Sequence, residues 1–147
     1  MLMLLYRFDV WYNTIMNFSE ILKPGLVAEK HDTVTDDKTA ASFGSGGIAV
    51  YATPAMIALM EGAAFSAAEV LPQGWSTVGT ELNVRHLSAT PVGMKVYARA
   101  ELLSVDGRTL SFKVEAFDEA GKIGEGSHGR FIIEVEKFLA KVKSKIK

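Results

Sequence analysis

The sequence of 147 residues contains no cysteine, which excludes disulfide bonds, thiolate metal ligands and a cysteine nucleophile. It also has no run of about 18 apolar residues, so we expect no segment that spans a membrane. Its formal net charge of −1 provides no basic surface for a nucleic acid. Only three histidines are present, His31, His86 and His128, and their spacing does not match a zinc site. We therefore expect a cytoplasmic protein with no metal and with neither a nucleic acid nor a membrane as partner.

Apolar residues make up 48% of the chain, which is enough for one compact domain with a hydrophobic core. The N-terminal stretch 1–10 is apolar, but Arg7 and Asp9 follow its apolar part and no basic residue precedes it, which is the wrong order for a signal peptide. Met16 is a plausible translation start. We therefore expect an N-terminal extension at 1–15 and a single domain at 16–147.

One carboxylate stands out among the apolar residues. Glu61 lies in the middle of the run Ala55–Phe65, which contains no other ionisable side chain. A charge in such a setting costs free energy unless it is paired or protonated, so an ionisable group placed there is a candidate for chemistry.

The pattern before and around Glu61 predicts a strand followed by a central helix. A strand is expected at 26–34, a polar loop at 35–47 and a second, short strand at 48–52. Thr53 followed by Pro54 is typical of a helix start, with Thr53 as the N-cap, and Pro72 ends the helix after about Leu71. Since this helix has few polar residues, most of its circumference should be covered.

After Gly74 the pattern changes to a period of two, which is typical of strands. The expected buried face of the first strand contains alternate residues: Val78, Thr80, Leu82, Val84 and His86. Three further strands at 94–105, 109–118 and 122–134 are joined by tight turns and predict an antiparallel meander. A basic, amphipathic helix at 136–147 should end the chain. We predict an α+β fold in which a curved antiparallel sheet wraps around one long central helix.

Five blocks of this sequence, taken in order, resemble the fluoroacetyl-CoA thioesterase-like family of hot-dog proteins. They are VYATPAMIALME at 50–61, VGT at 78–80, VRHLSATPVG at 84–93, VDGRTL at 105–110 and IGEGSHGR at 123–130. The resemblance extends from about Leu26 to the C-terminal helix. It implies a hot-dog fold, normally dimeric, that cleaves acyl-CoA thioesters.

The resemblance also implies a set of functional residues. Thr53, Glu61 and His86 match the catalytic threonine, glutamate and histidine of the family. Gly79 matches a glycine whose amide faces the thioester carbonyl, and Arg130 matches an arginine near the acyl site. Coenzyme A would be part of the substrate, and no separate cofactor is implied. The acyl group stays open between short and medium chains.

Each of these residues also has a structural interpretation. Thr53 can be an ordinary N-cap, and Glu61 can be a structural carboxylate paired with an arginine such as Arg130. His86 can be a core histidine and Gly79 a bulge or a point of close packing. His128 and Arg130 share a strand face, for which a solvated rim is the alternative interpretation.

The spacing of Thr53 and Glu61 adds a further prediction. Eight helical residues separate them by about 12 Å along the axis, too far for a direct hydrogen bond. A site that uses both therefore needs either a substrate that lies along the helix or residues from a second subunit. We predict a homodimer with sites at or near its interface.

The chemistry itself leaves alternatives open. Glu61 can serve as the nucleophile or as the base that activates water. Two other functions also fit the fold: a non-catalytic acyl-CoA binding or sensing domain, and an enoyl- or hydroxyacyl-thioester hydratase or dehydratase.

Overall fold

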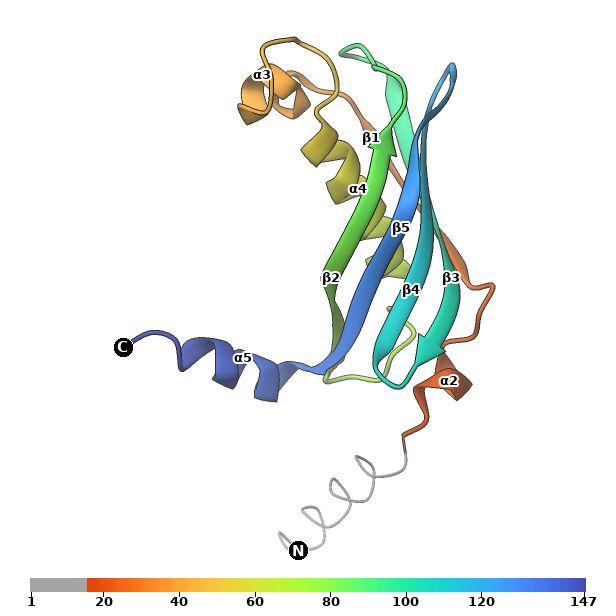
Figure 1. Ribbon diagram of the computed structural model, residues 1–147, viewed down its shortest axis with the longest axis vertical. Coiled ribbons are helices and arrows are strands. Elements are labelled where there is room, and N and C mark those ends of the chain that lie inside the picture. The colour runs from red at the N-terminus through yellow and green to blue at the C-terminus, as the bar shows by residue number, and fades with distance from the viewer. Residues whose placement is uncertain (1–15) are drawn as a thin grey trace, which may run out of the picture.

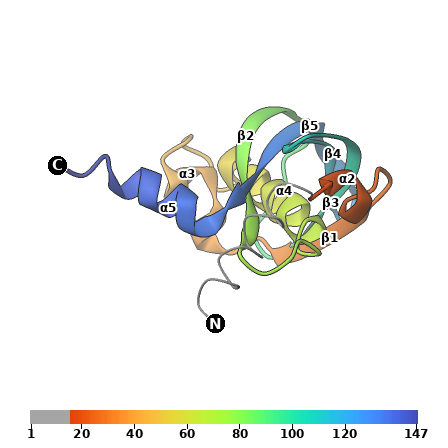
Figure 2. The same ribbon diagram turned by 90° about the horizontal axis from the view of Figure 1, so that it is seen from below.

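The computed structural model describes residues 16–147, and the expected extension at 1–15 lies outside these described residues. An antiparallel sheet of five strands, in the order β1-β3-β4-β5-β2, curves around one long helix, α4 (Figures 1 and 2). The strands are β1 (Val27–Thr33), β2 (Trp75–His86), β3 (Lys95–Asp106), β4 (Thr109–Asp118) and β5 (Gly121–Glu134). The predicted architecture is confirmed, and so is the meander, which consists of β3, β4 and β5.

Helix α4 (Thr53–Ala67) packs one face against the concave side of the sheet. The side chains on this face are all buried, and they are small or flexible: Ala55, Met56, Leu59, Met60, Ala63, Ala64 and Ala67. A second stripe, which includes Ala58, Glu61 and Phe65 and lies on the side of β2 and β5, is exposed or only partly covered. Most of the helix is therefore covered, as predicted, and this stripe is the part that a single chain leaves open.

Helix α4 ends at Ala67, four residues before the predicted end. The backbone N–H of Ala68 donates to the carbonyl of Phe65, and the N–H of Leu71 donates to the carbonyl of Ala68. These bonds span three residues, so the chain tightens into consecutive turns before Pro72 can act as a helix breaker.

The segment between β1 and α4 contains more structure than the sequence predicts. A 3-10 helix (Asp36–Lys38) and helix α3 (Ala40–Phe43) occupy the expected loop. The expected strand at 48–52 is wrong, because this segment makes only isolated bridges, Thr39 to Tyr51 and Val50 to Pro91. Two bridged residues, each with a different partner, cannot build a ladder.

Strand β2 lies at the edge of the sheet and pairs with β5 along its whole length. Its register shifts between Gly79 and Glu81, which marks a β-bulge. A bulge adds one residue and so reverses the side-chain alternation beyond it. Thr77 and Gly79 therefore share the inner face with His86, whereas the uninterrupted alternation had placed them on the opposite face.

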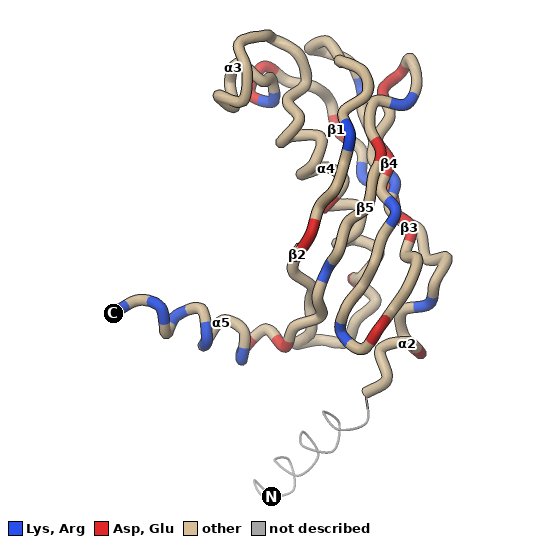
Figure 3. Tube along the Cα trace, in the orientation of Figure 1, with Lys and Arg blue, Asp and Glu red and all other residues tan. Residues whose placement is uncertain are grey.

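Two short helices lie at the ends of the described chain. Helix α2 (Phe18–Ile21) contacts β3, and helix α5 (Val135–Lys143) projects away from the sheet (Figures 1 and 2). Charges of both signs are spread over the strands, whereas α5 carries mainly lysines (Figure 3). None of the helices within 16–147 is long and apolar enough to span a membrane.

Candidate active site

Thr53 and His86 meet at the N-terminal end of α4. Oγ1 of Thr53 and Nδ1 of His86 are hydrogen-bonded at 2.8 Å. The N-cap of α4 is Ala52, and Thr53 is the first helical residue, so its hydroxyl does not cap the helix. The prediction that Thr53 is the N-cap is therefore wrong, because Pro54 lies within the first turn and the hydroxyl turns toward the imidazole instead.

Two features of the His86 imidazole bear on whether it can transfer protons. Within residues 16–147, its Nε2 atom is buried and has no hydrogen-bond partner. Burial lowers the pKa of His86 because it disfavours the imidazolium, and the nearby backbone carbonyl of Ser88, a potential acceptor for the imidazolium, offsets this only in part. The ring lines a cavity of about 370 Å³ together with Thr53, Tyr51 and Ser88. A neutral imidazole can accept a proton there at neutral pH.

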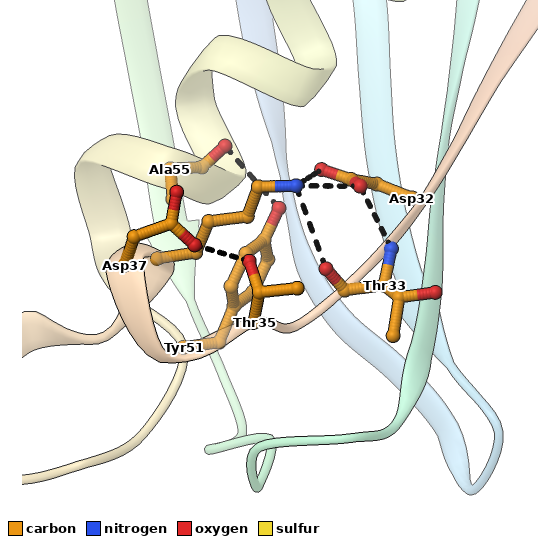
Figure 4. A network of polar contacts seen from close by, with 7 residues as sticks. Asp32, Thr33, Thr35, Asp37, Tyr51 and Ala55 are labelled. Carbon is orange, nitrogen blue, oxygen red and sulfur yellow. Dashed lines mark hydrogen bonds and ion pairs between the residues drawn. The ribbon is translucent and has the colours of Figure 1, made fainter.

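A network of polar contacts holds the segment between β1 and α4, some of whose residues line this cavity. Nζ of Lys38 pairs with the carboxylate of Asp32 and donates to the carbonyl of Thr33, which ties the 3-10 helix to β1. The hydroxyl of Tyr51 donates to the carbonyl of Ala55 at 3.2 Å, which ties the segment to α4 (Figure 4). Burial raises the pKa of Tyr51, so the phenol stays protonated and remains a donor. The network holds the start of α4, and with it Thr53, against β1.

Glu61, Gly79 and Arg130 form a second cluster farther along α4. Oε2 of Glu61 lies 3.8 Å from Nη1 of Arg130, and the Glu61 side chain is 40% exposed. Glu61 is therefore paired with Arg130, as one interpretation of the sequence expected, and its carboxylate lies on the side of α4 that faces β2 and β5. The arginine is buried, and burial lowers its pKa while Glu61 acts in the opposite direction.

Because Gly79 has no side chain, Glu61 and His128 can lie close to its backbone. A β-carbon at this position would lie 2.9 Å from Oε2 of Glu61 and 3.2 Å from Cε1 of His128. Any larger residue would therefore compete with both side chains for the same volume. Glu61, Gly79 and His128 also line a smaller cavity of about 220 Å³.

The interpretation of His128 and Arg130 as a solvated rim is wrong. Their exposed fractions are only 2% and 6%, because both lie on the inner face of β5, which is flanked in the sheet by β4 and β2. Nε and Nη2 of Arg130 donate to Oγ1 and the carbonyl of Thr77 at 2.8 and 2.9 Å. Strict alternation places Thr77 on the outer face, and the sequence signal for its inward position is Gly79, a residue that can mark the bulge found here.

The predicted site residues thus fall into two groups. Thr53 and His86 line the larger cavity, Glu61 and Gly79 line the smaller one, and no residue lines both. Arg130 belongs to the second group through its pair with Glu61. Within the described part of the chain, no cluster of three or more His, Asp or Glu side chains could hold a metal ion.

Comparison with known proteins gives the family context of this arrangement. A model of the family described as fluoroacetyl-CoA-specific thioesterase matches residues 34–136, which include all five predicted site residues. A fluoroacetyl-CoA thioesterase of Streptantibioticus cattleyicolor is 47% identical over 97 residues, which is 65% of this chain and 70% of the relative.

Solved structures are similar as well. A structure of the fluoroacetyl-CoA thioesterase FlK superposes with a TM-score of 0.78 at 38% identity, covering 85% of this chain and 98% of that one. A hot-dog-like protein from Thermanaerovibrio acidaminovorans gives a TM-score of 0.81 at 20% identity, covering 90% and 98% of the two chains. The fold is therefore a hot-dog fold, as predicted.

Proposed function

This chain belongs to the fluoroacetyl-CoA-specific thioesterase family, and from this premise we propose that it is a thioester hydrolase that cleaves acyl-CoA to a free acid and coenzyme A. The observation that carries the proposal is the hydrogen bond between Thr53 and His86, two residues that line a cavity of about 370 Å³. This is the polar arrangement that proton transfer during hydrolysis requires.

We propose a short or medium acyl group as the substrate. The relative from Streptantibioticus cattleyicolor is named for fluoroacetyl-CoA, whose acyl group has two carbons. The cavity beside Glu61, of about 220 Å³, has room for a small acyl group. Coenzyme A is part of the substrate, and we propose no separate cofactor.

In the proposed mechanism, the amide of Gly79 stabilises the negative charge that develops on the thioester oxygen. The water oxygen bonds the thioester carbon as the carbon–sulfur bond breaks, and the proton that this water loses reaches the leaving sulfur through His86. Glu61 serves either as the base that activates this water or as a nucleophile whose anhydride is then hydrolysed. Thr53 orients the imidazole through its hydrogen bond.

We further propose that one site combines Thr53 and His86 of one subunit with Glu61 of the partner subunit. The helical rise separates Thr53 from Glu61 by about 12 Å within a chain. A two-fold axis across the exposed stripe of α4, between these positions, would place Glu61 of each chain beside Thr53 of the partner subunit. The uncovered stripe with Phe65, 41% exposed, and the free edge of β2 support a homodimer on this side.

The test is release of free thiol from a panel of acyl-CoA thioesters, from acetyl to long-chain, by the unsubstituted protein and by Glu61→Ala and His86→Ala. We expect release by the unsubstituted protein and a loss on the order of 10²-fold in both variants, each shown to be folded. Saturable acyl-CoA binding that survives both substitutions, without any thiol release, would favour a binding or sensing domain instead. Hydration of an enoyl thioester without thiol release would favour a hydratase.

A further inference from the structure

His128 lies at the centre of the second cluster, although the family resemblance gives it no role. Its side chain is buried on the inner face of β5. Nδ1 lies 2.8 Å from the backbone carbonyl oxygen of Glu81, and Nε2 lies 3.2 Å from Nη1 of Arg130. One ring therefore joins the bulge of β2 to the buried arginine.

These two contacts allow only one protonation state of the ring. A carbonyl oxygen can only accept, so Nδ1 of His128 must carry a proton and donate it to Glu81. A guanidinium can only donate, so Nε2 must be unprotonated in order to accept from Arg130. The contacts therefore select the neutral imidazole with its hydrogen on Nδ1.

The orientation of Arg130 depends on this acceptor. Thr77 takes the hydrogen bonds of Nε and Nη2, which leaves Nη1 as the nitrogen nearest to Glu61. When His128 accepts one N–H of Nη1, the second N–H of this nitrogen is free for the carboxylate or for a substrate oxygen. The same ring holds the carbonyl of Glu81, directly after the shift in register that turns Gly79 inward.

We propose that His128 is a positioning residue of the thioesterase site, which as a neutral Nδ1–H imidazole holds Arg130 and the β2 bulge in the geometry that Glu61 and Gly79 require. This role rests on the proposed function, because it acts through residues assigned to thioester hydrolysis.

The surroundings of the ring keep it neutral. The groups that face it are Arg130 on β5, Glu61 on α4, the Glu81 carbonyl on β2 and the ring of Phe112 on β4, whose centroid is 6.5 Å away. Burial lowers the pKa of His128, and Arg130 adds to this effect, while the bond to Glu81 and the charge of Glu61 oppose it. Protonation would place an N–H of the ring against the N–H of Arg130 and break the contact.

Three substitutions separate this role from simple packing. His128→Gln can place its amide oxygen where Nε2 was, so it keeps the acceptor for Arg130. His128→Asn places its amide nitrogen where Nδ1 was, so it keeps only the donor to Glu81. His128→Met fills the volume with neither contact. Ile132→Val, a buried change two residues beyond Arg130 on the same strand face, is the matched control for packing.

The experiment measures kcat and KM for thiol release, thermal unfolding, and the histidine tautomers of the unsubstituted protein by ¹⁵N-resolved NMR. We expect the Nδ1–H tautomer for His128 at neutral pH, a fall in kcat of about tenfold or more in folded His128→Met, and recovery of most of this loss in His128→Gln. His128→Asn should resemble His128→Met, and Ile132→Val should lose stability with kcat unchanged.

An Nε2–H tautomer, or equal kcat in the methionine and glutamine variants, would overturn the positioning role while the proposed function stands. Absence of thiol release by the unsubstituted protein would contradict the proposed function, and the positioning role would fail with it. The two failures are therefore distinguishable.

Discussion

Substitution of Gly79 by alanine tests how tightly the second cluster is packed. The added β-carbon would lie 2.9 Å from Oε2 of Glu61, whereas ordinary van der Waals contact begins at 3.4 Å. The carboxylate must therefore move by at least 0.5 Å, the difference between these two distances. His128, whose Cε1 would lie 3.2 Å away, limits movement of the β-carbon in the other direction.

The expected result is a loss of activity with little loss of stability. The Glu61 carboxylate is the end of a flexible side chain that is 40% exposed, so it can move at a small cost in stability. Alanine is also more favourable than glycine in a strand by about 0.5–1 kcal/mol, which offsets part of this cost. A displacement of about 1 Å at a reacting group can cost about 10²-fold in rate, so half of that displacement should cost about tenfold in kcat/KM. Thiol release and thermal unfolding of Gly79→Ala measure both quantities.

The control is Gly47→Ala, because a β-carbon at position 47 meets no atom within 4 Å. In the background of Glu61→Ala, Gly79→Ala should have little further effect, since the group that it displaces is already absent. Wild-type kcat/KM in Gly79→Ala would refute the reasoning, and so would a variant that no longer folds.

Three further predictions concern other parts of the structure. Thr53→Val removes the hydroxyl that bonds Nδ1 of His86, so kcat should fall by at least about tenfold. Thr53→Ser keeps a hydroxyl and should retain most of the unsubstituted kcat. Equal kcat values for the two variants would contradict the positioning of His86 by this bond. Because burial lowers the pKa of His86 and its neutral form accepts the proton, the pH profile of kcat/KM should be level near neutral pH and fall only below the ordinary pKa of histidine; a fall that begins above this value would oppose the assignment. Gly126→Ala would place its β-carbon on the backbone of Asn83 and Val84, which cannot move aside as a side chain can, so thermal unfolding should show a loss of about 2 kcal/mol or more, and an unchanged melting temperature would be the opposing result.

Most of the fold can be predicted from the sequence, because it depends on periodicity and turn chemistry. Strand β4 was predicted at its observed bounds, Thr109–Asp118, since clear turn signals stand on both sides of it. The segment between β1 and α4 was harder to predict. The residues at 48–52 have the apolar character of a strand, yet their backbone groups pair with separate segments of the chain, which no local pattern reveals.

The site could be predicted only in part. The blocks of the family resemblance named Thr53, Glu61, His86, Gly79 and Arg130, and the structure gathers them into two clusters. The role of Thr77 depends on the bulge in β2, which inverts the alternation of side chains there, whereas His128 shares a face of β5 with Arg130, as predicted. A bulge is set by contacts between distant segments, so strict alternation along β2 assigned the face of Thr77 incorrectly.

The central claim is that each active site is assembled from two chains, with His86 supplied by one and Glu61 by the other. The most direct measurement is the rate of thiol release from mixed dimers of His86→Ala and Glu61→Ala chains, co-expressed with different tags and shown to be heterodimers. Each purified heterodimer has one intact site out of two, so we expect about half of the unsubstituted rate per dimer. No recovery of activity in verified heterodimers would contradict the claim and place both residues in the site of a single chain.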